Sequence, residues 1–75
     1  MNIEELKEII EENNIDINYD GMEEKTFSEL GIDSVDLMMI IFAIKDKYGI
    51  DFMMNKENTI KNLIDVVNRE IKNKE

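Results

Sequence analysis

The sequence of 75 residues contains no cysteine, no histidine, no tryptophan and no proline. Without cysteine it forms no disulfide, and without cysteine or histidine it cannot build the usual tetrahedral zinc site. A Ser-His-Asp triad is excluded as well, because that mechanism needs an imidazole base. We therefore predict a protein that is not an enzyme and that holds no metal ion.

Long apolar runs are also missing. The longest run, residues 37–44, covers about eight positions, whereas a membrane-spanning helix needs roughly 20. The first five residues, Met1 to Glu5, lack the basic start that is typical of a signal peptide. We expect a cytoplasmic protein with no membrane partner.

Positive charge is scarce, since 9 basic side chains face 18 acidic ones and the net charge is -9. Nucleic acids attract clusters of lysine and arginine, so this balance predicts no nucleic-acid partner and favours a basic protein surface instead. At 43% hydrophobic residues the chain is too apolar for an acidic disordered tail. Its length predicts one domain, residues 1–75, which we expect to be a monomer.

Apolar residues recur at helical spacing in three segments. They predict a first helix over residues 3–13 and a central helix over residues 34–48, which Gly49 ends. Asn58 and Thr59 offer a cap for a last helix that extends to about Ile71. Amphipathic helices of this length bury a single core by packing as a bundle.

Two shorter turns complete the predicted fold. Thr26 and Glu29 match a capping box and predict one helical turn that stops at Gly31, and a further turn is expected near residues 55–58. Residues 15–25 have loop composition, with isoleucines that we expect to point inward. No segment alternates as a strand does, so the fold class is all-α, a small bundle of three main helices plus one or two short helical turns.

Ser34 lies where a loop becomes the first turn of the central helix. Serine is a preferred N-cap, so an isolated Asp33-Ser34 pair predicts a cap and nothing more. A hydroxyl at this position is nevertheless exposed, and the unpaired amides and the dipole of the helix favour a phosphate there.

The segment Phe27-Ser28-Glu29-Leu30-Gly31-Ile32-Asp33-Ser34-Val35 resembles the phosphopantetheine attachment motif of the acyl carrier protein family. Weaker similarity lies in residues 47–50 and 59–64, and the resemblance extends from about Ile3 to Ile71. It implies a four-helix bundle, a 4'-phosphopantetheine arm that coenzyme A supplies to Ser34, and Asp33 as an acidic neighbour that helps a phosphopantetheinyl transferase to engage. Acyl or aminoacyl groups would travel on the arm as thioesters between acyl-loading and acyl-processing enzymes.

The resemblance also implies a partner surface on the central helix. One apolar stripe consists of Leu37, Ile40, Ile41, Ile44 and Tyr48, and a single helix cannot bury its whole circumference in so small a bundle. Methionine is common at adaptable binding surfaces. The residues on or beside the face that carriers present to enzymes are Val35, Asp36, Met38, Met39 and Phe42.

Three departures from the family pattern bear on the pathway. Met39 stands where fatty acid synthesis carriers usually have glutamate, and Lys45 and Lys47 lie near the end of the central helix. The segment between Gly49 and Thr59 is a few residues shorter, so the family's short third helix is expected to be reduced or irregular. These departures favour a free-standing carrier of a specialised polyketide or nonribosomal-peptide-type pathway, with a fatty acid synthesis carrier as the alternative.

Two other functions remain open. Residues 16–21 match the first six positions of an EF-hand calcium loop, but position 12 falls on Phe27, which has no carboxylate, so we expect an Asx-rich turn with Gly21 at positive φ. The second alternative is an unmodified interaction module that binds a partner helix through Met38, Met39 and Phe42. Covalent modification of Ser34 separates this module from a carrier.

Overall fold

The computed structural model describes residues 1–74, which form three α-helices and one 3₁₀ turn: α1 (Ile3–Glu12), η1 (Met22–Glu24), α2 (Ser34–Tyr48) and α3 (Ile60–Lys74). The predicted all-α class and the three main helices are confirmed. The 3₁₀ turn lies inside the segment that was expected to be irregular. No helix within residues 1–74 has both the length and the apolar character needed to cross a bilayer.

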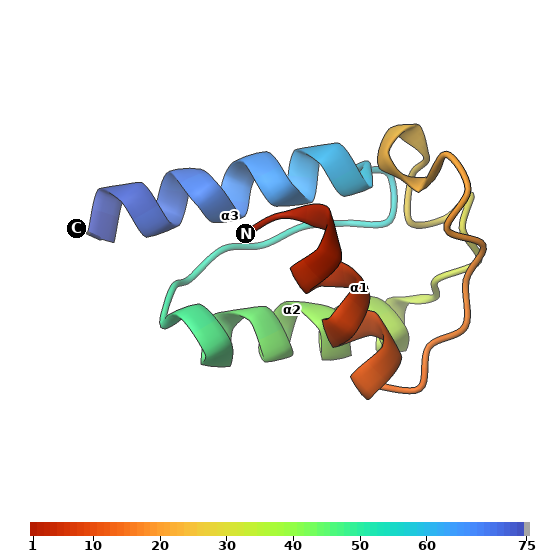
Figure 1. The fold of residues 1–75 in the computed structure, drawn as a ribbon, viewed down its shortest axis with the longest axis horizontal. Coiled ribbons are helices and arrows are strands. Elements are labelled where there is room, and N and C mark those ends of the chain that lie inside the picture. The colour runs from red at the N-terminus through yellow and green to blue at the C-terminus, as the bar shows by residue number, and fades with distance from the viewer. Residues whose placement is uncertain (75) are drawn as a thin grey trace.

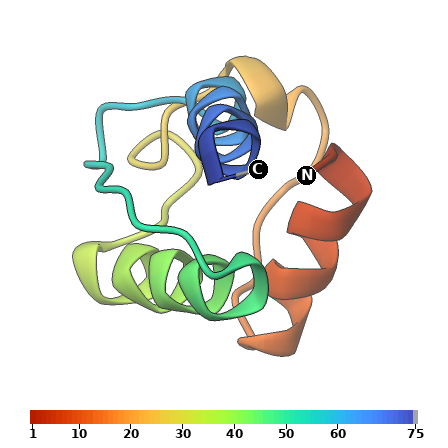
Figure 2. The same cartoon turned by 90° about the vertical axis from the view of Figure 1, so that its left-hand side faces the viewer.

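The helices α2 and α3 run in the same direction, because the segment that joins them returns along the length of the molecule (Figure 1). Helix α1 packs on α2 and covers one side of the bundle, and η1 contacts α3 (Figures 1 and 2). This arrangement places the start of α2 and the start of α3 at the same end of the molecule (Figure 1), and Ser34 is the first residue of α2. Tyr48 and the end of α3 meet at the opposite end, where the Lys74 ammonium donates to the Tyr48 carbonyl oxygen over 3.3 Å.

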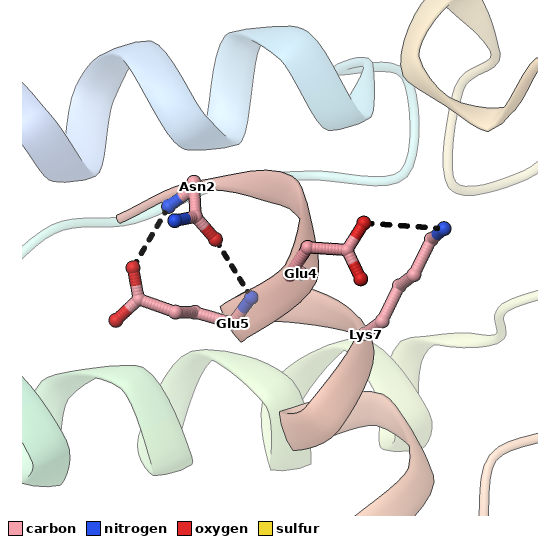
Figure 3. Close-up of polar contacts among 4 residues, drawn as sticks. All are labelled: Asn2, Glu4, Glu5 and Lys7. Carbon is pink, nitrogen blue, oxygen red and sulfur yellow. Dashed lines mark hydrogen bonds and ion pairs between the residues drawn. The ribbon is translucent and has the colours of Figure 1, made fainter.

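Helix α1 begins at a reciprocal cap. The Asn2 side-chain oxygen accepts from the Glu5 amide at 2.9 Å, and the Glu5 carboxylate accepts from the Asn2 amide at 3.1 Å (Figure 3). An ion pair of 3.8 Å joins Glu4 to Lys7 on the exposed side of the same turn (Figure 3). Two orphan amides at the helix start are thereby satisfied, which stabilises a helix of only ten residues.

The core is apolar throughout, since no polar side chain is buried in the part of the chain that the structure describes. The loop isoleucines Ile15 and Ile17 are buried, which confirms that they point inward. In the same loop the Asn18 side chain accepts from the Asp20 amide at 3.0 Å and Gly21 has φ +66°, as an Asx-rich turn requires. The buried residues are Leu6, Ile9, Ile10, Ile15, Ile17, Met22, Phe27, Ile32, Leu37, Ile40, Ile41, Ile44, Phe52, Ile60, Leu63 and Val67.

The loop that enters α2 is tied to the segment that enters α3. Phe27 N donates to Asn58 O at 3.1 Å, Ser28 N donates to Lys56 O at 3.0 Å, and Ile60 N donates to Lys25 O at 3.3 Å. The Thr26–Glu29 capping pair forms as predicted, with bonds of 2.9 and 3.1 Å. These bonds fix the backbone of residues 25–29, from which the loop continues to Ser34.

The segment between α2 and α3 contains no helix. Residues 50–55 have no regular secondary structure, and residues 55–58 form a single turn closed by the bond from Asn58 N to Asn55 O at 3.1 Å. The Asn55 side chain accepts from the Glu57 amide at 2.9 Å, and the Asn58 side chain accepts from the Asn55 amide at 3.0 Å. Such side-chain bonds compete with helix formation. The prediction that the family's short third helix is reduced is thus confirmed.

Candidate functional site

Asp33, and not Ser34, is the N-cap of α2. Asp33 has the extended backbone of a cap, with φ -82° and ψ 178°, and its carboxylate accepts from the Asp36 amide at 2.8 Å. Ser34 is the first residue of the helix. The prediction of Ser34 as the cap is therefore wrong: both residue types are good caps, and the ionised carboxylate satisfies the orphan amide at the positive end of the helix dipole.

This correction leaves the Ser34 hydroxyl available for chemistry. Ser34 is exposed, and the Ser34 and Val35 amides have no acceptor among residues 1–74. Free amides and the helix dipole both favour an anion at this position. The site therefore suits a phosphoester on the serine oxygen, and no side chain in the sequence offers it an imidazole base for catalysis.

The outer face of α2 is apolar and accessible. Its inward stripe of Leu37, Ile40, Ile41 and Ile44 is buried, whereas Val35 is 69% exposed and Phe42 is 56% exposed. Met38 and Met39 are each 38% exposed, and Asp36 is half-buried. The prediction that this helix cannot bury its whole girth is confirmed.

Met53 adds an apolar side chain to this region that the sequence did not single out. It is 68% exposed, and its sulfur lies 3.9 Å from the Lys45 ammonium on α2. Lys45 also forms an ion pair of 2.9 Å with Asp51, which lowers the pKa of the Asp51 carboxyl. The connection after α2 is thus held against the helix, although nothing in its local sequence indicates that position.

A groove of about 250 Å³ opens beside Ser34 and is called the Ser34 groove here. Leu37, Met38 and Met54 supply its apolar wall. Asn55 and Lys56, in the turn before α3, supply its polar residues. Lys56 was also missed by the sequence analysis, because only the fold brings residue 56 next to residue 34.

A larger cavity of about 530 Å³ lies between the start of α1 and η1. Its lining includes Glu4, Glu23 and Glu24 but neither Ser34 nor any other residue of α2. Its three carboxylates outnumber the single ammonium of Lys7 in the lining, so this cavity does not suit an anionic group. The Ser34 groove is smaller, but its lining has no carboxylate and one lysine, so it suits an anionic group better.

Comparison with known proteins bears on the family of the chain. Residues 3–67 match the family described as "Phosphopantetheine attachment site". An "Acyl carrier protein homolog" of Mycoplasma genitalium is 39% identical over 72 residues, which cover 91% of this chain and 81% of the relative. An "Acyl carrier protein homolog" of Ureaplasma parvum is 39% identical over 69 residues, and the match covers 91% of this chain and 88% of the relative. No solved structure matches the chain significantly.

Proposed function

This chain belongs to the acyl carrier protein family, whose members are carriers with covalently bound 4'-phosphopantetheine and not catalysts, and we propose that Ser34 is the attachment site. The observation that supports Ser34 most directly is its place as the exposed first residue of α2, next to two free amides. The chain would act as a single carrier domain in the cytoplasm.

The residues around Ser34 suit the attachment reaction. In the attachment reaction the Ser34 oxygen would bond to the phosphorus of coenzyme A next to the pantetheine, the phosphoanhydride bond would break with the nucleotide as leaving group, and the hydroxyl proton would pass to a base of the transferase. The Ser34 and Val35 amides, which are free at the positive end of α2, would stabilise a phosphodiester on the Ser34 oxygen. When bound, the arm supplies a thiol that carries an acyl or aminoacyl group as a thioester.

Asp33 is proposed as the residue that a phosphopantetheinyl transferase recognises beside the serine. One of its carboxylate oxygens caps α2, and the other makes no hydrogen bond to the rest of residues 1–74. That second oxygen is available to a donor or a cation of the transferase. The cap also fixes the orientation of the carboxylate relative to Ser34.

Enzymes that load and process the cargo are proposed to dock on the outer face of α2, through Val35, Asp36, Met38, Met39 and Phe42. The supporting observation is exposure, since four of these five side chains are large hydrophobics left uncovered. A contiguous patch of large apolar side chains on a protein surface is typical of an interaction site, whereas single exposed apolar residues are common everywhere. A net charge of -9 adds attraction to a basic rim on the partner.

We propose a specialised polyketide or nonribosomal-peptide-type pathway rather than housekeeping fatty acid synthesis. The resemblance to the family puts Met39 where fatty acid synthesis carriers usually have glutamate, and Lys45 and Lys47 add positive charge near the end of α2. The connection to α3 has no helix, so an enzyme would meet a different surface there. A fatty acid synthesis carrier is the alternative, and acceptance by enzymes of that pathway would favour it.

Intact mass spectrometry tests the attachment site. The protein is incubated with coenzyme A, magnesium and a broad-specificity phosphopantetheinyl transferase, and the product is mapped by peptide fragmentation. The expected result is a gain of one phosphopantetheine group on Ser34. Ser34→Ala abolishes this gain, whereas the exposed control Ser28→Ala retains it. An unmodified but folded wild-type protein would instead favour the interaction module.

A further inference from the structure

Lys56 stands out in the Ser34 groove because it is a cation in a strongly acidic protein. The groove is lined by Ser34, Leu37, Met38, Met54, Asn55 and Lys56, and none of these residues is acidic. With twice as many acidic as basic residues in the chain, a lining with one lysine and no carboxylate differs from the overall composition.

The Lys56 side chain is exposed and has no carboxylate partner among residues 1–74. Its backbone, in contrast, is fixed. The Lys56 carbonyl oxygen accepts from Ser28 N at 3.0 Å, and Asx bonds of Asn55 and Asn58 close the turn on either side. The Lys56 backbone is therefore held beside the groove that Ser34 also lines, and its ammonium has no carboxylate partner within residues 1–74.

The volume of the groove limits what it holds. About 250 Å³ lies below the roughly 300 Å³ at which pockets for drug-sized ligands begin. The groove thus suits the phosphate end of an arm that starts at Ser34, with Leu37, Met38 and Met54 against the first methyl and methylene groups. A long apolar cargo exceeds this space.

We propose that Lys56 is a positioning residue that pairs with the phosphodiester on Ser34 and holds the phosphate end of the arm in the Ser34 groove. This inference rests on the proposed attachment to Ser34. A lysine ammonium is a compact charge that binds phosphate oxygens without a fixed fork geometry, which suits an exposed and mobile partner. The pairing gives the arm a preferred direction from α2 towards the turn before α3.

Nuclear magnetic resonance of the loaded protein tests the pairing. Backbone amide shifts are compared between the unloaded and loaded forms of the wild type, of Lys56→Gln and of Lys61→Gln. Lys61 is an exposed lysine of α3 outside the groove, so its variant loses the same charge. In the wild type and in Lys61→Gln, loading is expected to shift the amides of residues 54–57, and in Lys56→Gln most of this shift is lost. Among the three loaded proteins, the phosphodiester ³¹P signal of Lys56→Gln is expected to differ from the signal shared by the other two.

Salt provides a second readout that a merely structural role of Lys56 would not produce. Raising the ionic strength from about 0.01 M to about 1 M shortens the Debye length from about 30 Å to about 3 Å and should remove the wild-type shifts. Suppose that loading shifts no amide of residues 54–57 in the wild type, or shifts them equally in Lys56→Gln. Either result overturns the role of Lys56 and leaves the attachment to Ser34 standing. Failure to load Ser34 at all overturns the proposed function and this inference with it.

Discussion

Two adjacent residues at the start of α2, Asp33 and Ser34, differ in what their side chains do. Asp33 caps α2 with its carboxylate, and Ser34 begins the helix with an exposed hydroxyl. The capping role and the proposed attachment of the arm therefore fall on different side chains. A serine that served as the cap would have its oxygen directed at a backbone amide, where a transferase could reach it less easily.

Substitutions at these two positions should affect stability differently. Asp33→Ala removes the cap and is expected to lower the free energy of unfolding by about 1 kcal/mol. Ser34→Ala, which removes no hydrogen bond seen among residues 1–74, is expected to change it by less than about 0.5 kcal/mol. Urea unfolding followed by circular dichroism measures both values. Equal losses in the two variants would show that Ser34 shares the capping role.

Met39 tests the proposed docking surface. Met39→Glu places a carboxylate on the outer face of α2, where it could pair with a basic residue of an enzyme of fatty acid synthesis. Since an exposed ion pair contributes about 0.2–1 kcal/mol, kcat/KM with such an enzyme should rise by up to about fivefold. The rate of acyl transfer to the carrier that bears the phosphopantetheine arm measures this effect. Asn73→Glu adds the same charge on α3 and should leave the rates unchanged. Identical responses of the two variants would indicate a general charge effect.

At the scale of elements, Tyr48 joins α1 to α2. Its hydroxyl donates to the Glu5 carboxylate at 2.9 Å. Burial, followed by this bond and the negative charges of Glu5 and Glu8, raises the pKa of Tyr48 to about 12. The same bond, with the Asn2 amide, lowers the pKa of Glu5. The contact is therefore strongest when the phenol is neutral and the carboxylate is ionised.

This contact predicts a loss of stability in alkali. Because the pKa of Tyr48 is raised on folding from 10.0 to about 12, its contribution is fully present below pH 10 and is lost as the pH rises towards 12. Tyr48→Phe should lower the free energy of unfolding at pH 8 and reduce its slope between pH 10 and 12. Urea unfolding at each pH measures this slope. Tyr19→Phe is the comparison, because the Tyr19 pKa is raised by burial and by the charges of Glu11 and Asp16, with no hydrogen bond to a carboxylate among residues 1–74, and it should reduce the slope less than Tyr48→Phe does. A wild-type slope retained in Tyr48→Phe would contradict the prediction.

The elements themselves could be predicted from the sequence because each shows a helical period and clear end signals. Thr59 and Asn62 satisfy each other's amides at the start of α3, as the predicted cap there suggests. The cap of α2 was misassigned because Asp33 and Ser34 are both good caps, and the sequence does not show which one has extended backbone. Met53 and Lys56 were missed for a different reason. Their positions depend on the path of an irregular segment across the bundle, which no local pattern records.

At the scale of the molecule, repulsion between like charges offsets part of the stability that a small apolar core provides. The chain has a net charge of -9 and few ion pairs to offset it among residues 1–74, where Glu4–Lys7 and Lys45–Asp51 are seen. Self-repulsion of this kind destabilises the compact state and also disfavours association of identical copies. It is consistent with the expected monomer.

Salt should therefore stabilise the protein. Raising sodium chloride from about 0.01 M to about 0.15 M reduces the Debye length from about 30 Å to about 8 Å and should increase the urea concentration at the midpoint of unfolding. Light scattering in the same buffers gives the molar mass, which should remain that of one chain of 8.8 kDa. A midpoint that falls with added salt would mean that favourable charge pairs outweigh the repulsion.

The backbone bonds between residues 25–28 and residues 56–60 also bear on protein synthesis. The segment that precedes Ser34 obtains its partners from residues about thirty positions later in the sequence. A nascent chain that has emerged only as far as α2 lacks these partners, so the loop before the serine has only its local bonds, such as the Thr26–Glu29 pair, at that stage. We expect recognition of Ser34 to begin only after the start of α3 has left the ribosome, which makes attachment of the arm a step that reports completed folding.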